Sequence, residues 1–318
     1  MKKFYFLLMA AFLVCLTGCS ENNSGKKIRI GVSIPAATHG WAGGVVWSAQ
    51  QAKARIEKDN PDVEVLLASS KTSADQVSRI ENLLARNVDA LVVMSQEPGP
   101  ITGICERAKK KGVFLVIVSN PLEKKVEDVF VNGDNRSFGE AAAEAMGSLL
   151  KGKGQILVME GIPCPINSDR VGAFRSVLKK KYPAIKILDS QSAYWNTEKG
   201  LLLMEVYLQK FKKIDAVWAG DDDVLLGALK ACRESKRKEI RFMVGGGGSK
   251  QVVKMIMDKD PLVQATVTYS PRMLETGVEA ALKGLRNGRK ALQKEIIIPS
   301  RIVTQANAKE FYFPSSVY

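Results

Sequence analysis

The sequence is poor in the residues that most often carry enzyme chemistry. It has one histidine, His39, and five scattered cysteines in 318 residues. A zinc site built from several histidines is excluded, and a Ser-His-Asp triad would have to use His39. The cysteines are too few for a disulfide framework. The C-x-x-C, H-E-x-x-H and G-x-S-x-G motifs are all missing, so we expect no enzyme, no metal and no cofactor.

The composition is that of an ordinary globular protein, with 46% hydrophobic and 25% charged residues. This excludes a collagen, a disordered tail and a coiled-coil rod. Because domains usually have about 100–200 residues, two lobes are expected. The 47 lysines and arginines outnumber the 33 acidic residues, which gives a net charge of +14. Such a charge raises nucleic acid or an anionic surface as a partner.

The first residues indicate export. Two lysines precede the apolar run Phe4–Leu16, which is shorter than the about 20 residues of a membrane-spanning helix. Leu16-Thr17-Gly18-Cys19 resembles a bacterial lipobox. That resemblance implies a signal peptide over residues 1–18, lipidation of Cys19, a tether over 19–27 and a membrane-anchored protein of the cell envelope. The alternative is an ordinary cleaved signal with an incidental cysteine.

Cleavage of the signal peptide would lower both the net charge and the number of cysteines. Removal of residues 1–18 takes away two lysines and leaves a net charge of +12 on 300 residues. Export and the lack of aromatics among the lysine clusters favour a solvated basic surface, so we expect no nucleic-acid partner. Cys105, Cys164 and Cys232 remain, and we expect buried free thiols.

Short apolar runs alternate with amphipathic segments from residue 28 onward. Apolar runs without polar alternation are typical of strands buried on both faces of a parallel sheet. The rhythm breaks near Val129–Asp134 and then resumes. It predicts an α/β protein with two doubly wound, Rossmann-like lobes whose ligand lies beyond the carboxyl ends of the strands. The expected strands are Ile28–Ile34, Val63–Ala68, Ala90–Met94, Val113–Val118, Val129–Asn132, Gln155–Met159, Ile185–Ser190, Ala216–Ala219, Phe242–Val244, Val263–Thr268 and Ile296–Ile298.

Aromatic side chains follow two of these strands. Trp41 lies in a glycine-rich loop after the first strand, and Trp195 lies in the segment after Ile185–Ser190. Either Trp41 covers the end of the sheet, or it offers a flat apolar face to a ligand. Two indoles from opposite lobes would hold the apolar face of a sugar ring while polar groups bind its hydroxyls.

Charged residues follow two other strands. Arg170, in Asn167-Ser168-Asp169-Arg170 at an expected helix start, suits paired hydroxyls or a carboxylate, or else a surface ion pair. Asp221, Asp222 and Asp223 lack the spacing of a metal loop, and one of them suits a helix N-cap. We assign Asp221, nearest the strand end, to ligand binding.

The run Gly245–Gly248 is followed by Ser249, Lys250 and Gln251. The Walker pattern fails because no serine or threonine follows Lys250, and the dinucleotide-binding pattern fails because Lys250 stands at its last glycine. A close approach of the backbone to a ligand, or a flexible turn, is the remaining interpretation.

Over residues 28–304 the sequence resembles the ribose-binding type of bacterial periplasmic binding protein. The specific stretches are Asp215–Leu229, Val244–Gly248 and the helix start Arg170–Phe174. The resemblance implies two lobes joined by three crossings, near 132–134, 269–270 and 299–301. The lobes would then comprise residues 28–132 plus 270–298 and residues 133–269 plus 299–318. By position it also implies ligand contacts from Ser33, His39, Trp41, Ser119, Asn120, Arg170, Trp195, Asp221, Gly247 and Tyr269.

Some of these positions depart from the family pattern. Asp221 stands in place of an asparagine, and Tyr269 in place of a hinge glutamine. An Asp-Arg pair that grips the sugar is replaced by Ser119 and Asn120, and a further aspartate by Gly247. Ribose itself is therefore disfavoured, and we expect a larger cleft that is less specific for hydroxyls.

The resemblance implies a monomeric solute receptor, tethered by lipid, that delivers a small carbohydrate or polyol to the permease of an ABC importer. Three alternatives stay open. The same cleft would serve a sensor that feeds a two-component or chemotaxis system. It would also serve a binding protein for a non-sugar solute. A repressor would need a helix-turn-helix where the signal segment stands.

Overall fold

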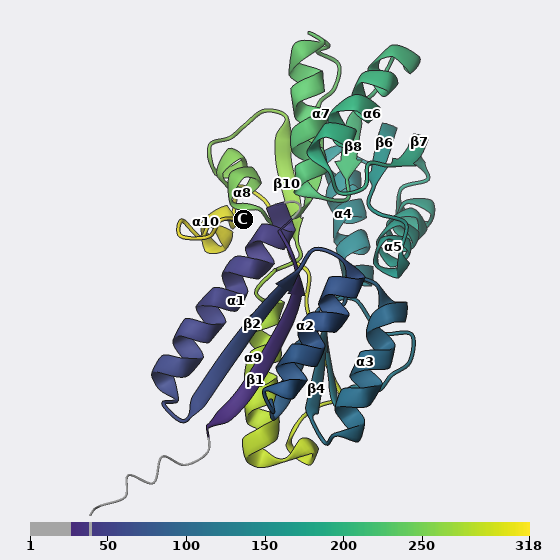
Figure 1. Cartoon of the computed structure of the whole chain (residues 1–318). Helices are drawn as coiled ribbons and strands as arrows, with labels where there is room; N and C mark the ends of the chain where they lie inside the picture. Colours follow the sequence, from purple (N-terminus) through teal and green to yellow (C-terminus); the bar gives the residue numbers. More distant parts are fainter. Residues whose placement is uncertain (1–26, 38–39) are drawn as a thin grey trace, which may run out of the picture.

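The computed structural model describes residues 27–37 and 40–318, which form two lobes stacked along the long axis of the molecule (Figure 1). His39 and Cys19 lie outside the described residues. Each lobe is built on one six-stranded sheet covered by helices on both faces. The predicted α/β architecture with two doubly wound lobes is therefore confirmed.

The sheet of the first lobe is entirely parallel, in the order β11-β5-β4-β3-β1-β2. Every residue of β3 and β4 is buried, because helices cover both faces. Such strands need side chains that are apolar throughout, which is why they read as continuous aliphatic runs. The strands are β1 (Ile28–Pro35), β2 (Val63–Ser70), β3 (Ala90–Val93), β4 (Phe114–Val118), β5 (Val129–Gly133) and β11 (Glu295–Ile298).

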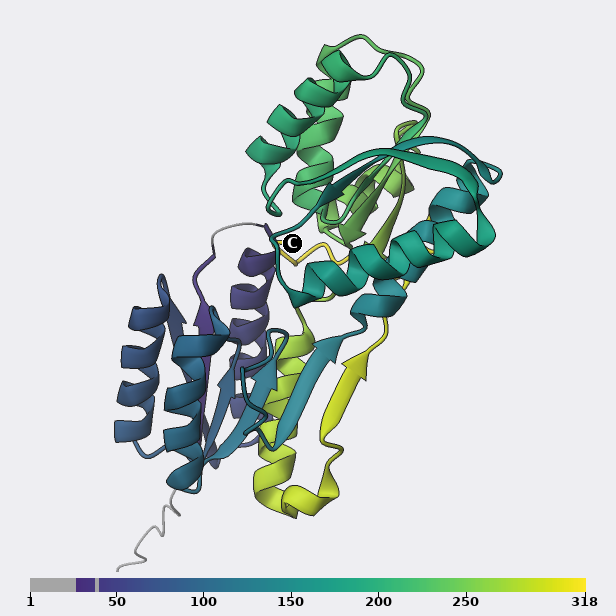
Figure 2. The ribbon, with the colours of Figure 1, turned by 90° about the vertical axis from the view of Figure 1, so that its right-hand side faces the viewer.

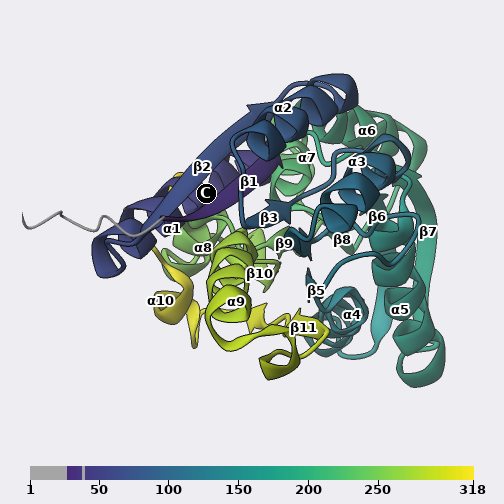
Figure 3. The same cartoon turned by 60° about the horizontal axis from the view of Figure 1, so that its bottom comes forward.

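Two helices pack on each face of this first sheet (Figure 3). On one face lie α1 (Gly40–Asp59) and α9 (Met273–Asn287), which is followed by the short 3-10 helix η1 (Arg289–Ala291). On the other face lie α2 (Ser73–Ala85) and α3 (Pro98–Lys110). The α2 helix begins after Thr72, whose hydroxyl accepts a hydrogen bond from the Asp75 amide at 3.1 Å.

The sheet of the second lobe has the order β12-β10-β9-β8-β6-β7, and only β12 runs antiparallel to its neighbour. Helices α4 and α5 cover one face, and α6, α7 and α8 the other, with α10 against α8. The strands are β6 (Lys153–Glu160), β7 (Ala184–Ser192), β8 (Ala216–Ala219), β9 (Phe242–Gly247), β10 (Val263–Thr268) and β12 (Ile302–Val303). The helices are α4 (Asn135–Leu149), α5 (Pro165–Lys181), α6 (Thr197–Lys210), α7 (Asp222–Glu234), α8 (Lys250–Met257) and α10 (Ala308–Phe311).

All the predicted strands are present, with ends that differ by a few residues. The short strand β12 was not predicted, because two residues carry no periodicity. The helix that bears Arg170 begins earlier than expected, at Pro165. Proline suits this first position because its φ is already helical and its missing N–H would have no partner there. Arg170 therefore lies in the second turn of α5.

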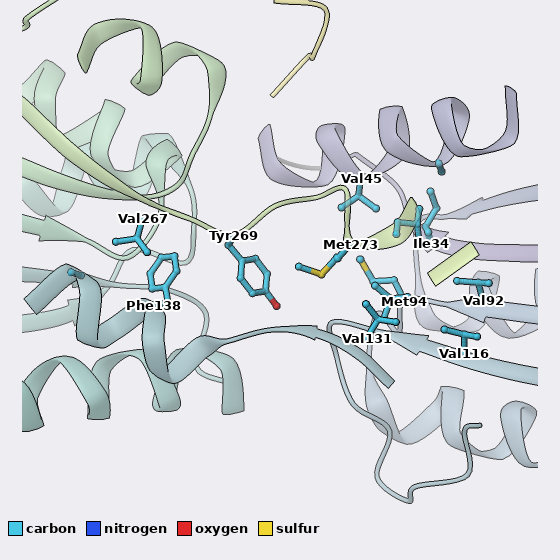
Figure 4. Packing of buried hydrophobic residues seen from close by; sticks show 14 of the residues in the cluster. Ile34, Val45, Val92, Met94, Val116, Val131, Phe138, Val267, Tyr269 and Met273 are labelled. Atoms are coloured by element: carbon cyan, nitrogen blue, oxygen red, sulfur yellow. The ribbon is translucent and has the colours of Figure 1, made fainter. Parts of the chain in front are cut away.

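The chain passes three times between the sheets: from β5 to α4, from β10 to α9 and from β11 to β12. One apolar core runs through this junction, from the α1 face of the first sheet to the α4 face of the second. Tyr269 lies in the middle of it, between Phe138 of the second lobe and Met273 of the first (Figure 4). The strands of both sheets end toward the junction (Figure 2).

The cysteines of the described residues are free thiols. Burial raises the pKa of Cys105 and of Cys232 to about 12, so both behave as small apolar residues. Cys164 differs from the expectation because it is only half-buried: it precedes Pro165 at the start of α5.

Candidate functional site

A cavity of about 220 Å³ lies between the lobes. It is smaller than the about 300–1,000 Å³ of pockets for drug-sized ligands, so it suits a small solute. Its walls come from the carboxyl ends of strands in both sheets, where ligands of open α/β sheets bind. The structure brings to this cavity the predicted residues Trp41, Ser119, Asn120, Arg170, Trp195, Asp221, Gly247 and Tyr269.

Arg170 is a buried cation held between aromatic rings. Its guanidinium carbon lies 4.1 Å from the ring centre of Phe138 and 4.2 Å from that of Tyr269. Its Nε donates a hydrogen bond of 2.9 Å to Asn135 Oδ1. Burial lowers the pKa of this guanidinium, and the nearby Tyr269 and Asp221 oppose that shift. A planar cation fixed in this way suits recognition of paired oxygens, and the surface ion pair is excluded.

Tyr269 joins the lobes at the second crossing. Its hydroxyl donates to Asn132 Oδ1 at 3.0 Å and lies 3.0 Å from Ser119 Oγ. Its carbonyl accepts a hydrogen bond of 2.8 Å from Trp41 Nε1, and the two rings lie 5.6 Å apart at a tilt of 34°. Trp41 therefore packs with part of its surface against Tyr269 at the second crossing, and it also lines the cavity.

Two predicted residues follow strand β4. Ser119 has a left-handed backbone, with a φ of 66°, which a non-glycine residue rarely adopts. Asn120 Nδ2 donates to the Ser95 carbonyl at 2.9 Å, which fixes the amide at the cavity wall. Uncharged hydroxyl and amide groups therefore occupy this wall.

Trp195 closes the cavity from the second lobe and is half-buried. Tyr194 and Trp195 have φ values of 57° and 52°, so the backbone is held in a rare conformation next to the site. The indole lies over Gly161, where an added Cβ would be 1.9 Å from Trp195 Nε1. A glycine is thus needed at residue 161 for Trp195 to reach the cavity.

The three consecutive aspartates have three separate roles. Asp221 lines the cavity and also caps α7, since its Oδ1 accepts from the Asp223 amide at 2.8 Å. Burial, followed by the charges of Asp223 and Asp222, raises its pKa well above the ordinary value. Asp223 reaches across the junction and accepts from the Gly40 amide at 2.8 Å, at the start of α1. Both the N-cap and the ligand interpretation of Asp221 therefore fit its position.

Asp222 is fully buried and ties the glycine run to its neighbours. Its carboxylate accepts hydrogen bonds from Gly246 N at 2.9 Å, Ser249 N at 2.6 Å and Thr266 Oγ1 at 2.8 Å. Burial raises its pKa to about 6, although these donors favour the ionised form.

This shift predicts a pH dependence of stability. The folded protein keeps the Asp222 proton up to about pH 6, whereas the unfolded chain loses it near its ordinary pKa of 3.8. The contribution of this carboxyl to the free energy of unfolding is therefore full below pH 3.8 and falls as the pH rises to 6. In urea titrations, we expect the free energy of unfolding of the wild type, relative to that of Asp222→Asn, to fall by about 2 kcal/mol from pH 4.5 to 7.5. A relative free energy that stays constant or rises over this range would contradict this assignment.

Gly247 ends β9 at the cavity with a φ of 124°, a region that favours glycine. A Cβ at this residue would be 2.0 Å from the hydroxyl oxygen of Tyr318. Tyr318 therefore occupies the space beside Gly247 on the side where a Cβ would point.

Ser33 does not reach the cavity. Side chains alternate along a strand, and that of Ser33 points into the core, where its hydroxyl accepts a hydrogen bond of 3.2 Å from Gln76 Nε2. The assignment of Ser33 to ligand binding is therefore corrected, because its side chain lies in the core and not in the cavity. His39 falls outside the described residues, so its role as a ligand contact stays a prediction.

The structure adds polar residues that the sequence analysis missed. Ser70 ends β2, Lys71 follows it, and Gln96 follows β3; all three line the cavity. Among residues 27–37 and 40–318, the buried Ser70 hydroxyl and Gln96 Oε1 find no hydrogen-bond partner. Such orphan groups cost stability unless a ligand or water satisfies them. The rule that ligands bind after strands would have found these residues too.

No group of three or more metal-binding side chains occurs within residues 27–37 and 40–318. Over the same residues, no helix is both long and apolar enough to span a bilayer.

Comparison with known proteins gives relatives over most of the chain. The ribose import binding protein of Bacillus subtilis is 29% identical, over an alignment that covers 96% of this chain and all of that protein. A putative rhizopine-binding protein of Rhizobium meliloti is 28% identical over 75% of this chain and 78% of its own length. These relatives are binding proteins and not enzymes, which confirms the prediction that the chain is not an enzyme.

Solved structures share the fold. An ABC transporter solute binding protein of Bacillus halodurans with bound myo-inositol has a TM-score of 0.78 at 23% identity, and the match covers 92% of this chain and 99% of that one. The periplasmic binding protein domain family matches residues 30–290. Membership implies an exported protein. The chain belongs to the periplasmic binding protein family.

Proposed function

We propose that this protein captures a small carbohydrate or polyol in the cavity between its lobes. The observation that carries the proposal is the composition of that cavity. It combines the aromatic surfaces of Trp41 and Trp195 with the buried guanidinium of Arg170 and with uncharged hydroxyl and amide groups. Rings suit the C–H face of a sugar, and the polar groups suit its hydroxyls. The ligands in the names of the relatives, which include ribose and xylitol, support this class.

A panel of candidate solutes tests the proposal. It contains D-ribose, D-allose, D-xylose, D-apiose, xylitol and myo-inositol, which occur in the names of relatives or solved neighbours. A solute that binds only the folded protein at about 100 times its Kd stabilises it by about 2.7 kcal/mol. We therefore expect at least one member to raise the melting temperature by several degrees. If none does, the carbohydrate proposal fails.

We further propose that the loaded protein delivers its solute to an ABC importer. A solute that contacts both lobes favours their closed arrangement, and closure would present the surface that a permease recognises. The cavity is complete within one chain, so we expect a monomer that binds one solute. The proposed lobes comprise residues 28–132 plus 270–298 and residues 133–269 plus 299–318. Uptake of the bound panel member should fall in cells that lack this protein, and unchanged uptake would refute the importer role.

The anchor is proposed on the sequence Leu16-Thr17-Gly18-Cys19. A diacylated cysteine with a third acyl chain gives more than one lipid anchor, which makes attachment stable. Cells fed labelled palmitate should label the wild type and not Cys19→Ala, which should then leave the membrane fraction. Equal labelling of both would refute lipidation at Cys19.

A further inference from the structure

The first turn of α1 touches the second lobe, although it is not one of the three crossings between the lobes. The Gly40 amide, at the start of the helix, donates a hydrogen bond of 2.8 Å to Asp223 Oδ2 at the start of α7. One turn later, Gly44 lies against Tyr318, the last residue of the sequence. The end of the chain is marked beside the start of α1 in Figure 1. Two groups of the second lobe therefore meet one helix of the first.

Both contacts depend on glycines that share one face of α1. Residues four apart lie one above the other on a helix. A Cβ at Gly40 would be 2.8 Å from Asp223 Oδ1, and a Cβ at Gly44 would be 2.8 Å from Tyr318 Cβ. A Cβ at Gly43, in the same turn, would meet no atom within 4 Å. The second lobe can therefore approach the Gly40–Gly44 face so closely only because these two residues have no side chain.

The two partners of this face are fixed to the second lobe. Asp223 lies in the first turn of α7. Lys250 Nζ, at the start of α8, donates hydrogen bonds to the carbonyls of Ser316 and of Pro314, the latter at 3.3 Å. The Tyr318 amide donates to Ser316 Oγ at 3.1 Å. A rotation of one lobe against the other would therefore move both partners relative to α1.

The Gly40–Gly44 face lies beside the cavity but does not form its wall. Trp41 and Ala42 line the cavity from the same turn of α1, whereas neither the two glycines nor their two partners do. In the arrangement seen here, residues of both lobes line one cavity. A carboxylate is favourable at the positive N-terminal end of a helix, and the tyrosine adds packing. These contacts therefore stabilise the arrangement that encloses a solute.

We propose that the Gly40–Gly44 face of α1 is a contact surface on which Asp223 and Tyr318 of the second lobe dock when the lobes close. The contacts set the affinity for the solute through the equilibrium between open and closed lobes, because tight binding requires the closed state to be populated. The four residues are positioning residues that do not touch the solute. This inference rests on the proposed capture of a solute between the lobes.

The first test compares Gly44→Ala with Gly43→Ala. Both changes add one methyl group to the same helix turn, but only the methyl group at residue 44 meets Tyr318. In calorimetric titrations with each panel member that the wild type binds, we expect Gly44→Ala to weaken binding about tenfold. We expect Gly43→Ala to bind within twofold of wild type. An affinity of Gly44→Ala within twofold of wild type would overturn the proposal.

Binding kinetics distinguish a change in closure from a general loss of structure. The solute enters while the lobes are apart, so a weaker contact between closed lobes speeds release and leaves association unchanged. We expect this pattern in stopped-flow tryptophan fluorescence for Gly44→Ala, and also for Asp223→Ala, which removes the carboxylate from the Gly40 amide. A loss of affinity that arises from slower association instead would overturn the proposal.

A cross-link tests the contact without a solute. The 2.8 Å between a Cβ at residue 44 and Tyr318 Cβ is below the about 3.5–4.5 Å of a disulfide, so a small shift suffices to form one. The variant Gly44→Cys, Tyr318→Cys should link on mild oxidation and then be more compact in X-ray scattering than when reduced. The control Gly43→Cys, Tyr318→Cys should stay unlinked.

Failure of the first variant to link, or an equal radius of gyration with and without the link, would overturn the proposal. This readout holds even if no panel member binds the wild type, an outcome that would refute the proposed function alone.

Discussion

Arg170→Met should lower the affinity of the protein for its solute by about 100-fold or more. A hydrogen bond to a charged group contributes about 1.5–3 kcal/mol, and a guanidinium can donate two such bonds side by side. Methionine keeps the unbranched apolar stem of the side chain, but it is shorter than arginine, does not place a group between the rings of Phe138 and Tyr269, and has no donor. Calorimetric titration of both proteins with the panel measures the loss.

Arg175→Met is the matched control for this change. Arg175 lies on the same helix α5 but is exposed, and it pairs with Glu160 at 3.3 Å. Exposed pairs contribute little, so the control should bind as wild type does. The melting temperature of Arg170→Met should stay the same or rise, because a buried cation is costly to desolvate. An affinity within threefold of wild type would show that Arg170 does not bind the solute.

Gly139→Ala should destabilise the second lobe by about 1–3 kcal/mol and weaken solute binding at the same time. Gly139, in α4, lies where that helix meets α5. An added Cβ would be 2.0 Å from the carbonyl oxygen of Arg170 and 3.0 Å from the amide nitrogen of Phe174. Both are backbone atoms, so the helix itself has to move and carries Arg170 away from its stacked position. Urea unfolding and calorimetry measure the two effects.

Gly172→Ala provides the control within α5. An added Cβ there meets no atom within 4 Å, and the residue is exposed. Alanine is preferred over glycine in helices by about 1 kcal/mol, so this variant should be slightly more stable than wild type and should bind normally. If Gly139→Ala were as stable as wild type, the close contact between the helices would be refuted.

The strands were predicted well from the sequence because buried strands have a recognisable local pattern of apolar residues. Strands such as β3 and β4 are covered on both faces and are therefore aliphatic throughout. Strand β12 has two residues and pairs antiparallel at the edge of the sheet, so nothing in the sequence distinguishes it from a loop.

The cavity was predictable only in part. The ends of strands are marked in the sequence, and Arg170, Asp221 and Trp195 follow from that rule. The side of the sheet to which a residue points depends on strand register, which is why Ser33 was placed wrongly. Tyr318 meets Gly247 only because the chain folds back over the second lobe, and this contact between distant residues has no local sequence signal.

Isothermal titration calorimetry of the purified protein tests the central claim most directly. The wild type and Arg170→Met are each titrated with the six solutes of the panel. We predict saturable binding of one molecule per chain for at least one sugar or polyol, with the affinity lost in Arg170→Met and kept in Arg175→Met. The absence of binding by every member of the panel, or binding that survives in Arg170→Met, would contradict the assignment of this cavity to a carbohydrate or polyol.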